Sequence, residues 1–162
     1  VNPANARAHY LTTGPELWED CGGKLDVFVA GVGTGGTFTG SVKYLKEKNP
    51  ALRAVAVEPQ GSPVLSCGKA GAHGLQGIGA GFVPDILDTS LIDEVIAVTE
   101  GDAYEIGRTL ARSDGVFCGI SAGAAAWAAV RLAQRQENEG KRIAVIIPDT
   151  GARYLSVENY FE

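Results

Sequence analysis

The chain alternates between short apolar runs and stretches in which apolar residues recur every three or four positions. The first pattern predicts β-strands and the second predicts amphipathic helices. Five runs are predicted strands, at residues 25–30, 53–57, 94–98, 115–118 and 142–147. Because helical stretches separate most of them, the sequence predicts an α/β fold with a mostly parallel sheet flanked by helices.

Two predicted helices carry end signals. The helix after residue 37 has one apolar face, formed by Phe38, Val42 and Leu45, and Asn49-Pro50 ends it. Thr99, with Asp102 three residues later, resembles a capping box at the start of another helix, which Gly115 ends. These signals predict where the two helices begin and end.

The segment between residues 59 and 91 differs from the rest of the chain. It contains seven glycines, namely Gly61, Gly68, Gly71, Gly74, Gly77, Gly79 and Gly81. Long loops inside a compact domain are usually functional, so a role in binding is expected here. A rigid surface turn is the alternative.

Length and charge narrow the classes of protein. The 162 residues are 45% hydrophobic and 20% charged, which suits one α/β domain over residues 1–162. Fourteen basic against 19 acidic residues give a net charge of −5, so no nucleic acid partner is expected. No segment has the roughly 20 apolar residues of a membrane span, and no signal peptide is recognised, so a cytoplasmic location is expected.

The cysteines and the first residues add two expectations. Cys21, Cys67 and Cys118 lie far apart and lack the close pairing of zinc or redox sites, so no metal site is expected. The chain contains no methionine and begins with Val1-Asn2-Pro3, which resembles the middle of a protein. We therefore expect a fragment.

The first candidate site is the glycine loop, Gly33-Thr34-Gly35-Gly36-Thr37, which follows an apolar strand and opens a helix. Glycines let the backbone approach a ligand closely, and the first amides of a helix are unpaired donors at the positive end of its dipole. This arrangement predicts a phosphate-binding site. A turn that simply needs glycine is the alternative.

The same region also fits a dinucleotide-binding motif, Gly31-x-Gly33-x-x-Gly36. Glu58 closes the next strand, about where an acid that binds a ribose is expected, roughly 20 residues past the glycines. Pro59 and the two threonines of the glycine loop argue against this reading, because short hydroxyl donors suit a compact phosphomonoester. A nicotinamide-binding Rossmann domain is nevertheless an alternative, as is a non-catalytic domain that only binds a partner.

The second candidate site is Gly119-x-Ser121-x-Gly123, within a predicted strand, turn and helix over residues 115–127. This motif matches the nucleophile elbow of α/β-hydrolases, but His9 and His73 both precede the serine, which disfavours a hydrolase. Ser121 as a simple helix N-cap is another interpretation. If both glycine-flanked strand ends lie on one edge of the sheet, a single cofactor would place its phosphate at the first and a polar ring atom at the second.

Three motifs together resemble the cysteine synthase family, also called O-acetylserine sulfhydrylases. They are the glycine loop, residues 76–84 (QGIGAGFVP) and residues 119–124 (GISAGA), and the likeness runs nearly from end to end. The resemblance implies the fold of tryptophan-synthase-like enzymes (fold type II), which depend on pyridoxal 5'-phosphate. It identifies this chain with the C-terminal half, the domain that binds the cofactor phosphate.

The resemblance also implies roles for individual residues. The cofactor phosphate would lie on Gly33, Thr34, Gly35, Gly36 and Thr37, and Ser121 would meet the pyridine nitrogen. The substrate cleft would be bordered by the cleft loop, made of Gln76, Gly77, Ile78, Gly79, Ala80, Gly81 and Phe82. A serine, unlike a carboxylate, leaves the ring nitrogen largely neutral and favours loss of a β-substituent.

The implied reaction replaces the acetate of O-acetylserine with sulfide to give cysteine. In the family the Schiff-base lysine lies in the N-terminal half, and no lysine here occurs in that motif, so the catalytic residue is not in this chain and the chain alone is expected to be inactive. The family also implies a homodimer and, as a candidate partner, the C-terminal tail of serine acetyltransferase. Cystathionine β-synthases share the glycine loop and the serine and are the nearest alternative.

Overall fold

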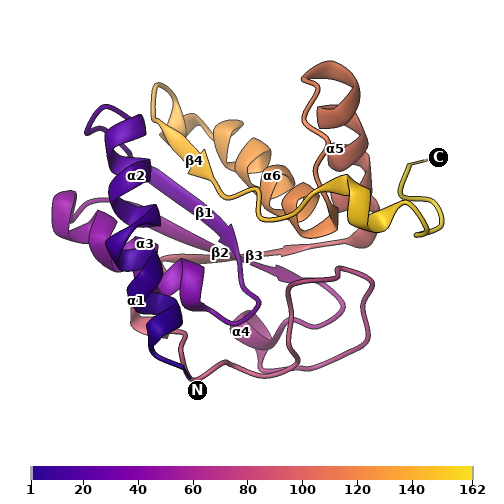
Figure 1. Ribbon diagram of the computed structural model, residues 1–162, viewed down its shortest axis with the longest axis horizontal. Coiled ribbons are helices and arrows are strands. Elements are labelled where there is room, and N and C mark those ends of the chain that lie inside the picture. The colour runs from indigo at the N-terminus through magenta and orange to yellow at the C-terminus, as the bar shows by residue number, and fades with distance from the viewer. Residues whose placement is uncertain (1, 162) are drawn as a thin grey trace.

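A computed structural model describes residues 2–161 and has one parallel sheet at its centre (Figure 1). Its strands are β1 (Val27–Gly31), β2 (Arg53–Pro59), β3 (Glu94–Val98) and β4 (Ile143–Val145). They lie in the order β3-β2-β1-β4, and every neighbouring pair is parallel. The predicted α/β fold class is confirmed.

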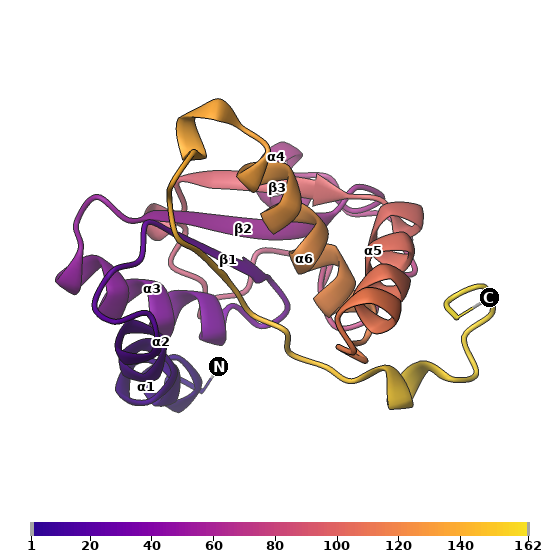
Figure 2. The same ribbon diagram turned by 90° about the horizontal axis from the view of Figure 1, so that it is seen from above.

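Helices cover both faces of the sheet (Figure 2). One face carries the helices α1 (Ala4–Leu11), α2 (Thr13–Asp20) and α3 (Gly36–Lys48), and the other carries α5 (Glu100–Ser113) and α6 (Ile120–Ala133). Short helical turns complete the chain: α4 (Val64–Cys67), η1 (Thr89–Leu91), η2 (Gln136–Asn138) and η3 (Gly151–Tyr154). Within residues 2–161, no helix has both the length and the apolar character needed to cross a bilayer.

The core has two parts, one on each face of the sheet. Along β1, Val27 and Val29 pack with α6, whereas Phe28 and Ala30 pack with α3. Burial on both faces explains why the strands are almost continuously apolar in sequence. The predicted apolar face of α3 is confirmed, because Phe38, Val42 and Leu45 are completely buried.

The predicted ends agree in part. Thr99 caps α5 by accepting a hydrogen bond from the backbone of Asp102, as predicted. The strand predicted at residues 115–118 is wrong: Gly115 turns the chain at φ 69°, Val116 and Phe117 are exposed, and Cys118 forms only an isolated antiparallel bridge with Thr150. The chain passes from α5 into α6 without entering the sheet, so that run has no neighbouring strand to pair with.

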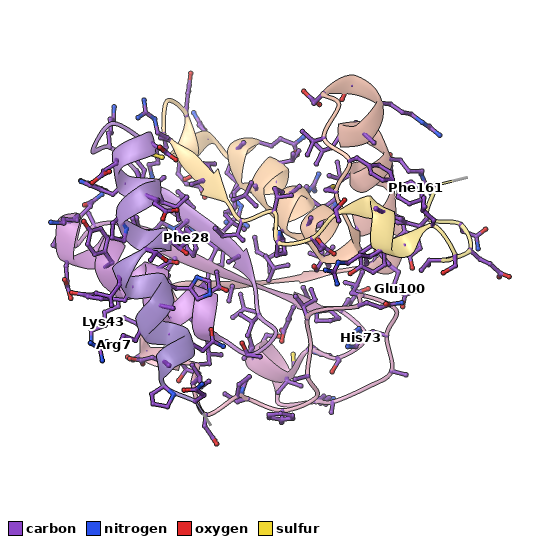
Figure 3. All side chains as sticks on the ribbon, in the orientation of Figure 1. Arg7, Phe28, Lys43, His73, Glu100 and Phe161 are labelled. Carbon is purple, nitrogen blue, oxygen red and sulfur yellow. The ribbon has the colours of Figure 1, made fainter. Side chains whose placement is uncertain are left out.

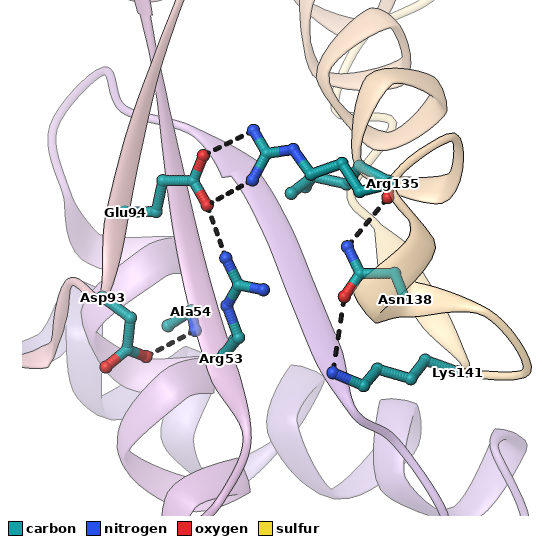
Figure 4. Close-up of polar contacts among 8 residues, drawn as sticks. Arg53, Ala54, Asp93, Glu94, Arg135, Asn138 and Lys141 are labelled. Atoms are coloured by element: carbon teal, nitrogen blue, oxygen red, sulfur yellow. Dashed lines mark hydrogen bonds and ion pairs between the residues drawn. The ribbon is translucent and has the colours of Figure 1, made fainter.

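A carboxylate at the edge of the sheet ties three elements together (Figure 4). Glu94 of β3 accepts hydrogen bonds from Arg135, after α6, at 2.7 and 2.9 Å, and from Arg53 of β2 at 2.7 Å. These guanidinium groups, with Arg135 contributing most, hold the pKa of Glu94 below its ordinary value. The cluster anchors the edge strand at the end of the sheet remote from the glycine loop.

Candidate functional site

The glycine loop joins the end of β1 to the start of α3. Gly35 is the N-cap of α3, has φ 84° and is buried against Leu87, which lies 2.7 Å from where a Cβ would be. Both its conformation and this close approach require glycine. The loop therefore presents the first amides of α3 at the carboxyl end of the sheet, where open α/β folds bind ligands.

Helix α1 holds the two threonines of the glycine loop. Asn5 donates a hydrogen bond from Nδ2 to Oγ1 of Thr34 at 3.0 Å, and Nε2 of His9 lies 3.1 Å from Oγ1 of Thr37. Nδ1 of His9 lies 2.9 Å from Oγ1 of Thr13, and partial burial lowers the pKa of His9. Asn5 and His9 thus restrain the hydroxyls of Thr34 and Thr37.

Sequence reasoning assigned no such role to Asn5 and His9. One signal was present: the two residues are four apart, so a helix places them on one face, among small apolar neighbours. Their contact with the glycine loop spans about 28 residues. Nothing in the local sequence pattern predicts a contact between residues so far apart in the chain.

The cleft loop lies directly against the glycine loop. A Cβ on Gly33 would be only 2.5 Å from the carbonyl oxygen of Gly77, and the amide of Gly79 donates to the carbonyl of Val32 at 3.0 Å. Three glycines of the cleft loop have positive φ values, which are 93° at Gly77, 70° at Gly79 and 81° at Gly81. Left-handed conformations of this kind favour glycine, which explains the composition of the segment.

Ser121 lies on the other side of Gly77. It is buried at the start of α6, and a Cβ on Gly77 would be 3.3 Å from its Oγ. Since Gly77 touches both Gly33 and Ser121, the two candidate sites are close enough for one small molecule to reach both.

Two other interpretations of Ser121 are wrong. The N-cap of α6 is Gly119, not Ser121, and the amide of Ala122 is satisfied by Oδ1 of Asp149 at 3.0 Å. The strand that a nucleophile elbow requires before the serine is also missing from the described structure, as shown above for residues 115–118. Ser121 therefore neither caps α6 nor lies in a nucleophile elbow in the described structure.

A cavity of about 400 Å³ opens beside the two loops. It is lined by Gly33, Thr34, Gly77, Ile78, Ala80, Phe82, Pro84, Asp85 and Ile86. Of the expected cleft residues, Gln76, Gly79 and Gly81 do not line it in the described structure. The chain's six lysines, all described, also lie outside the lining.

Glu58, the acid that the dinucleotide interpretation requires, already has hydrogen-bond partners within the chain. Glu58 is 2% exposed, and its carboxylate accepts hydrogen bonds from the amides of Leu65 and Ser66 at 2.7 and 3.2 Å. The hydroxyl of Ser66 donates a third, at 2.5 Å. The carboxylate therefore binds the first amides of α4 and is not free to bind a ribose, which contradicts the interpretation.

A parallel sheet with a glycine loop at the start of a helix is typical of α/β proteins that bind a phosphorylated ligand. The sequence profile of the family described as pyridoxal-phosphate dependent enzyme matches residues 1–149, and the chain belongs to this family. Members of the family use pyridoxal phosphate as cofactor.

Individual relatives are cysteine synthases and similar enzymes. The chain is 48% identical to cysteine synthase from Staphylococcus aureus strain Mu50 over 98% of its own length and 51% of that protein. O-acetylserine sulfhydrylase isoform 3 from Entamoeba histolytica superposes with a TM-score of 0.96 at 46% identity, over 99% of this chain and 48% of that one. An O-acetylserine dependent cystathionine beta-synthase from Helicobacter pylori superposes with a TM-score of 0.91 at 42% identity, over 98% of this chain and 51% of that one.

These findings confirm the resemblance seen in the three motifs. The chain spans about half the length of the curated relatives that it matches. The activity of the whole protein is therefore a matter of proposal.

Proposed function

We propose that this chain is the C-terminal half of a two-domain cysteine synthase that replaces the acetate of O-acetylserine with sulfide. In this proposal residues 1–162 act as a single domain. The observation that carries the proposal is the position of Gly77, which lies between Gly33 of the glycine loop and Ser121 of α6. The similarity to cysteine synthases over nearly the whole chain supports the choice of reaction.

The glycine loop fits the phosphate of pyridoxal 5'-phosphate. Side chains at Gly33, Gly35 or Gly36 would collide with Gly77, Leu87 and Asn5, so only glycine allows the loop to pack in this shape. The first amides of α3 carry the positive end of the helix dipole. The hydroxyls of Thr34 and Thr37 would add short donors around the phosphate, oriented by Asn5 and His9. We infer that these residues bind the phosphate.

Ser121 fits the pyridine nitrogen. Ser121 is a buried residue with an uncharged side chain, and it lies beside Gly77 of the cleft loop. A hydroxyl leaves the ring nitrogen largely neutral, whereas a carboxylate would keep it protonated. The chemistry that the cofactor supplies when bound is electron withdrawal from the α-carbon of the amino acid, which favours departure of the acetate group.

The cleft loop would border the bound amino acid. Gly77, Ile78, Ala80 and Phe82 line the cavity next to the glycine loop, and Phe82 is 64% exposed. We propose that closure of this loop excludes water from the substrate. The lysine that attaches the cofactor would come from the other half of the protein, since the lysines of this chain lie outside the cavity lining.

A second candidate reaction uses a different sulfur donor. The Helicobacter pylori relative is an O-acetylserine dependent cystathionine beta-synthase, with nearly the same backbone over 98% of this chain. That relative favours homocysteine as an alternative nucleophile at the same site. The cleft residues described here are compatible with either donor.

Partners and location complete the proposal. We propose a homodimer, and we propose that the apolar cavity wall formed by Ile78, Phe82 and Ile86 accepts the C-terminal tail of serine acetyltransferase. A cytoplasmic location is supported by three cysteines in the free thiol form, namely Cys21, Cys67 and Cys118.

The proposed reaction is tested with the full-length protein that carries this chain. Incubation with pyridoxal phosphate and O-acetylserine should yield cysteine with sulfide, and cystathionine formation from homocysteine decides between the two donors. We expect residues 1–162 alone to be inactive and activity to return when the other half is added. Cysteine formation by the isolated chain would refute the assignment of the missing lysine.

A further inference from the structure

His73 is a partly buried imidazole that the proposed reaction does not use. Its Nε2 lies 2.9 Å from the carbonyl oxygen of Gly79 in the cleft loop. A carbonyl oxygen only accepts hydrogen bonds, so Nε2 carries the proton and donates it. Its Nδ1 is buried and has no hydrogen-bond partner among residues 2–161.

Gly79 is therefore held from two directions. Its amide donates to the carbonyl of Val32, at the end of β1, and its carbonyl accepts from His73. Between Gln76 and Phe82 the chain has three residues with positive φ and few side chains of its own to fix it. His73 supplies the side-chain contact that the glycines lack.

The surroundings of His73 restrict its movement. A Cβ on Gly79 would lie 2.5 Å from Cγ of Pro59, and a Cβ on Gly61 would lie 3.3 Å from Cβ of His73. The amide of the next residue, Gly74, donates to the Glu100 carboxylate of α5, which lies beside this turn (Figure 3). The imidazole is thus packed between the end of β2 and the cleft loop.

We propose that His73 is a positioning residue that holds the cleft loop in its binding shape and thereby sets the affinity for the amino-acid substrate. This inference rests on the proposed function. It concerns substrate affinity because the loop residues on either side of Gly79 line the cavity. Thr34 and Thr37 are held separately by Asn5 and His9, so phosphate binding should not depend on His73.

Two substitutions at this position separate the hydrogen bond from the packing. His73→Phe keeps a ring of similar size but removes the donor, and His73→Gln keeps an amide N–H that can reach the Gly79 carbonyl. Lys69→Ala is the matched control, because Lys69 lies in the same segment and is exposed. All three are made in the full-length protein with bound cofactor.

We expect His73→Phe to raise the KM for O-acetylserine about tenfold, the effect of one lost hydrogen bond to a partly buried carbonyl. The dissociation constant of pyridoxal phosphate should change less than about twofold, and His73→Gln should restore most of the KM. An unchanged KM in His73→Phe, or a parallel loss of cofactor affinity, would overturn the proposal.

A second measurement needs no activity. Amide hydrogen exchange in the peptide that contains residues 77–81 should be about tenfold faster in His73→Phe and near wild type in His73→Gln and Lys69→Ala. Equal exchange in all four proteins would overturn the positioning role. If the wild-type protein makes no cysteine, the proposed reaction fails, while the exchange data still decide the role of His73.

Discussion

Substituting Gly33 with alanine tests the contact on which the site depends. The new Cβ would lie 2.5 Å from the carbonyl oxygen of Gly77, about 0.9 Å inside the 3.4 Å at which ordinary contact begins. The clashing atom belongs to the backbone, so one of the two loops must move. Overpacking of this size costs about 1–3 kcal/mol, and the displaced amides would no longer match a phosphate.

We therefore expect Gly33→Ala to lower the free energy of unfolding by about 1–3 kcal/mol. The dissociation constant of pyridoxal phosphate should rise about tenfold or more, since each 1.4 kcal/mol is a factor of ten. Urea unfolding and a cofactor titration followed by absorbance measure the two effects in the full-length protein.

Gly101→Ala is the control for this experiment. Gly101 lies in the first turn of α5, its φ is not positive, and the nearest atom to a new Cβ is 3.9 Å away. This variant should bind the cofactor as the wild type does. Wild-type cofactor affinity in Gly33→Ala would refute the reasoning that the two loops form one site.

Three further predictions concern stability. Glu94→Gln should lower the free energy of unfolding by about 1 kcal/mol near neutral pH. Because folding lowers the pKa of Glu94, this difference is complete above the ordinary glutamate pKa of 4.5 and should shrink as the pH falls below that value. Urea unfolding at several pH values measures the difference. Thr99→Ala should cost about 1 kcal/mol through loss of the α5 cap, measured by thermal unfolding, with Thr109→Ala in the same helix as the comparison. Gly40→Ala should push α1 away from α3, because the alanine Cβ would lie 2.8 Å from Cβ of His9. The free energy of unfolding, measured in urea, should fall by about 1–3 kcal/mol, and a value equal to wild type would contradict this packing.

The sequence predicts the sheet well because burial determines its pattern. After their charged first residues, Arg53 and Glu94, the runs at residues 53–57 and 94–98 are entirely apolar, and they match β2 and β3 closely. The run at residues 115–118 has the same local pattern, but no strand lies beside it to complete a ladder. Strand formation there depends on a distant partner, which local periodicity does not contain.

The site shows the same division between local and distant causes. The glycine loop is a local motif, since its glycines and the helix start lie within a few residues. The contacts of Asn5 with Thr34 and of His9 with Thr37 depend on how α1 packs on α3. The contact of Gly77 with Ser121 depends on a long loop returning to the sheet edge, and only coordinates reveal it.

The most direct test of the account is a structure of the full-length protein with pyridoxal phosphate bound. We expect the phosphate within hydrogen-bond distance of the amides of residues 33–37, and the ring nitrogen within hydrogen-bond distance of the Ser121 hydroxyl. A cofactor bound elsewhere, or one whose ring nitrogen meets a different side chain, would contradict the central claim.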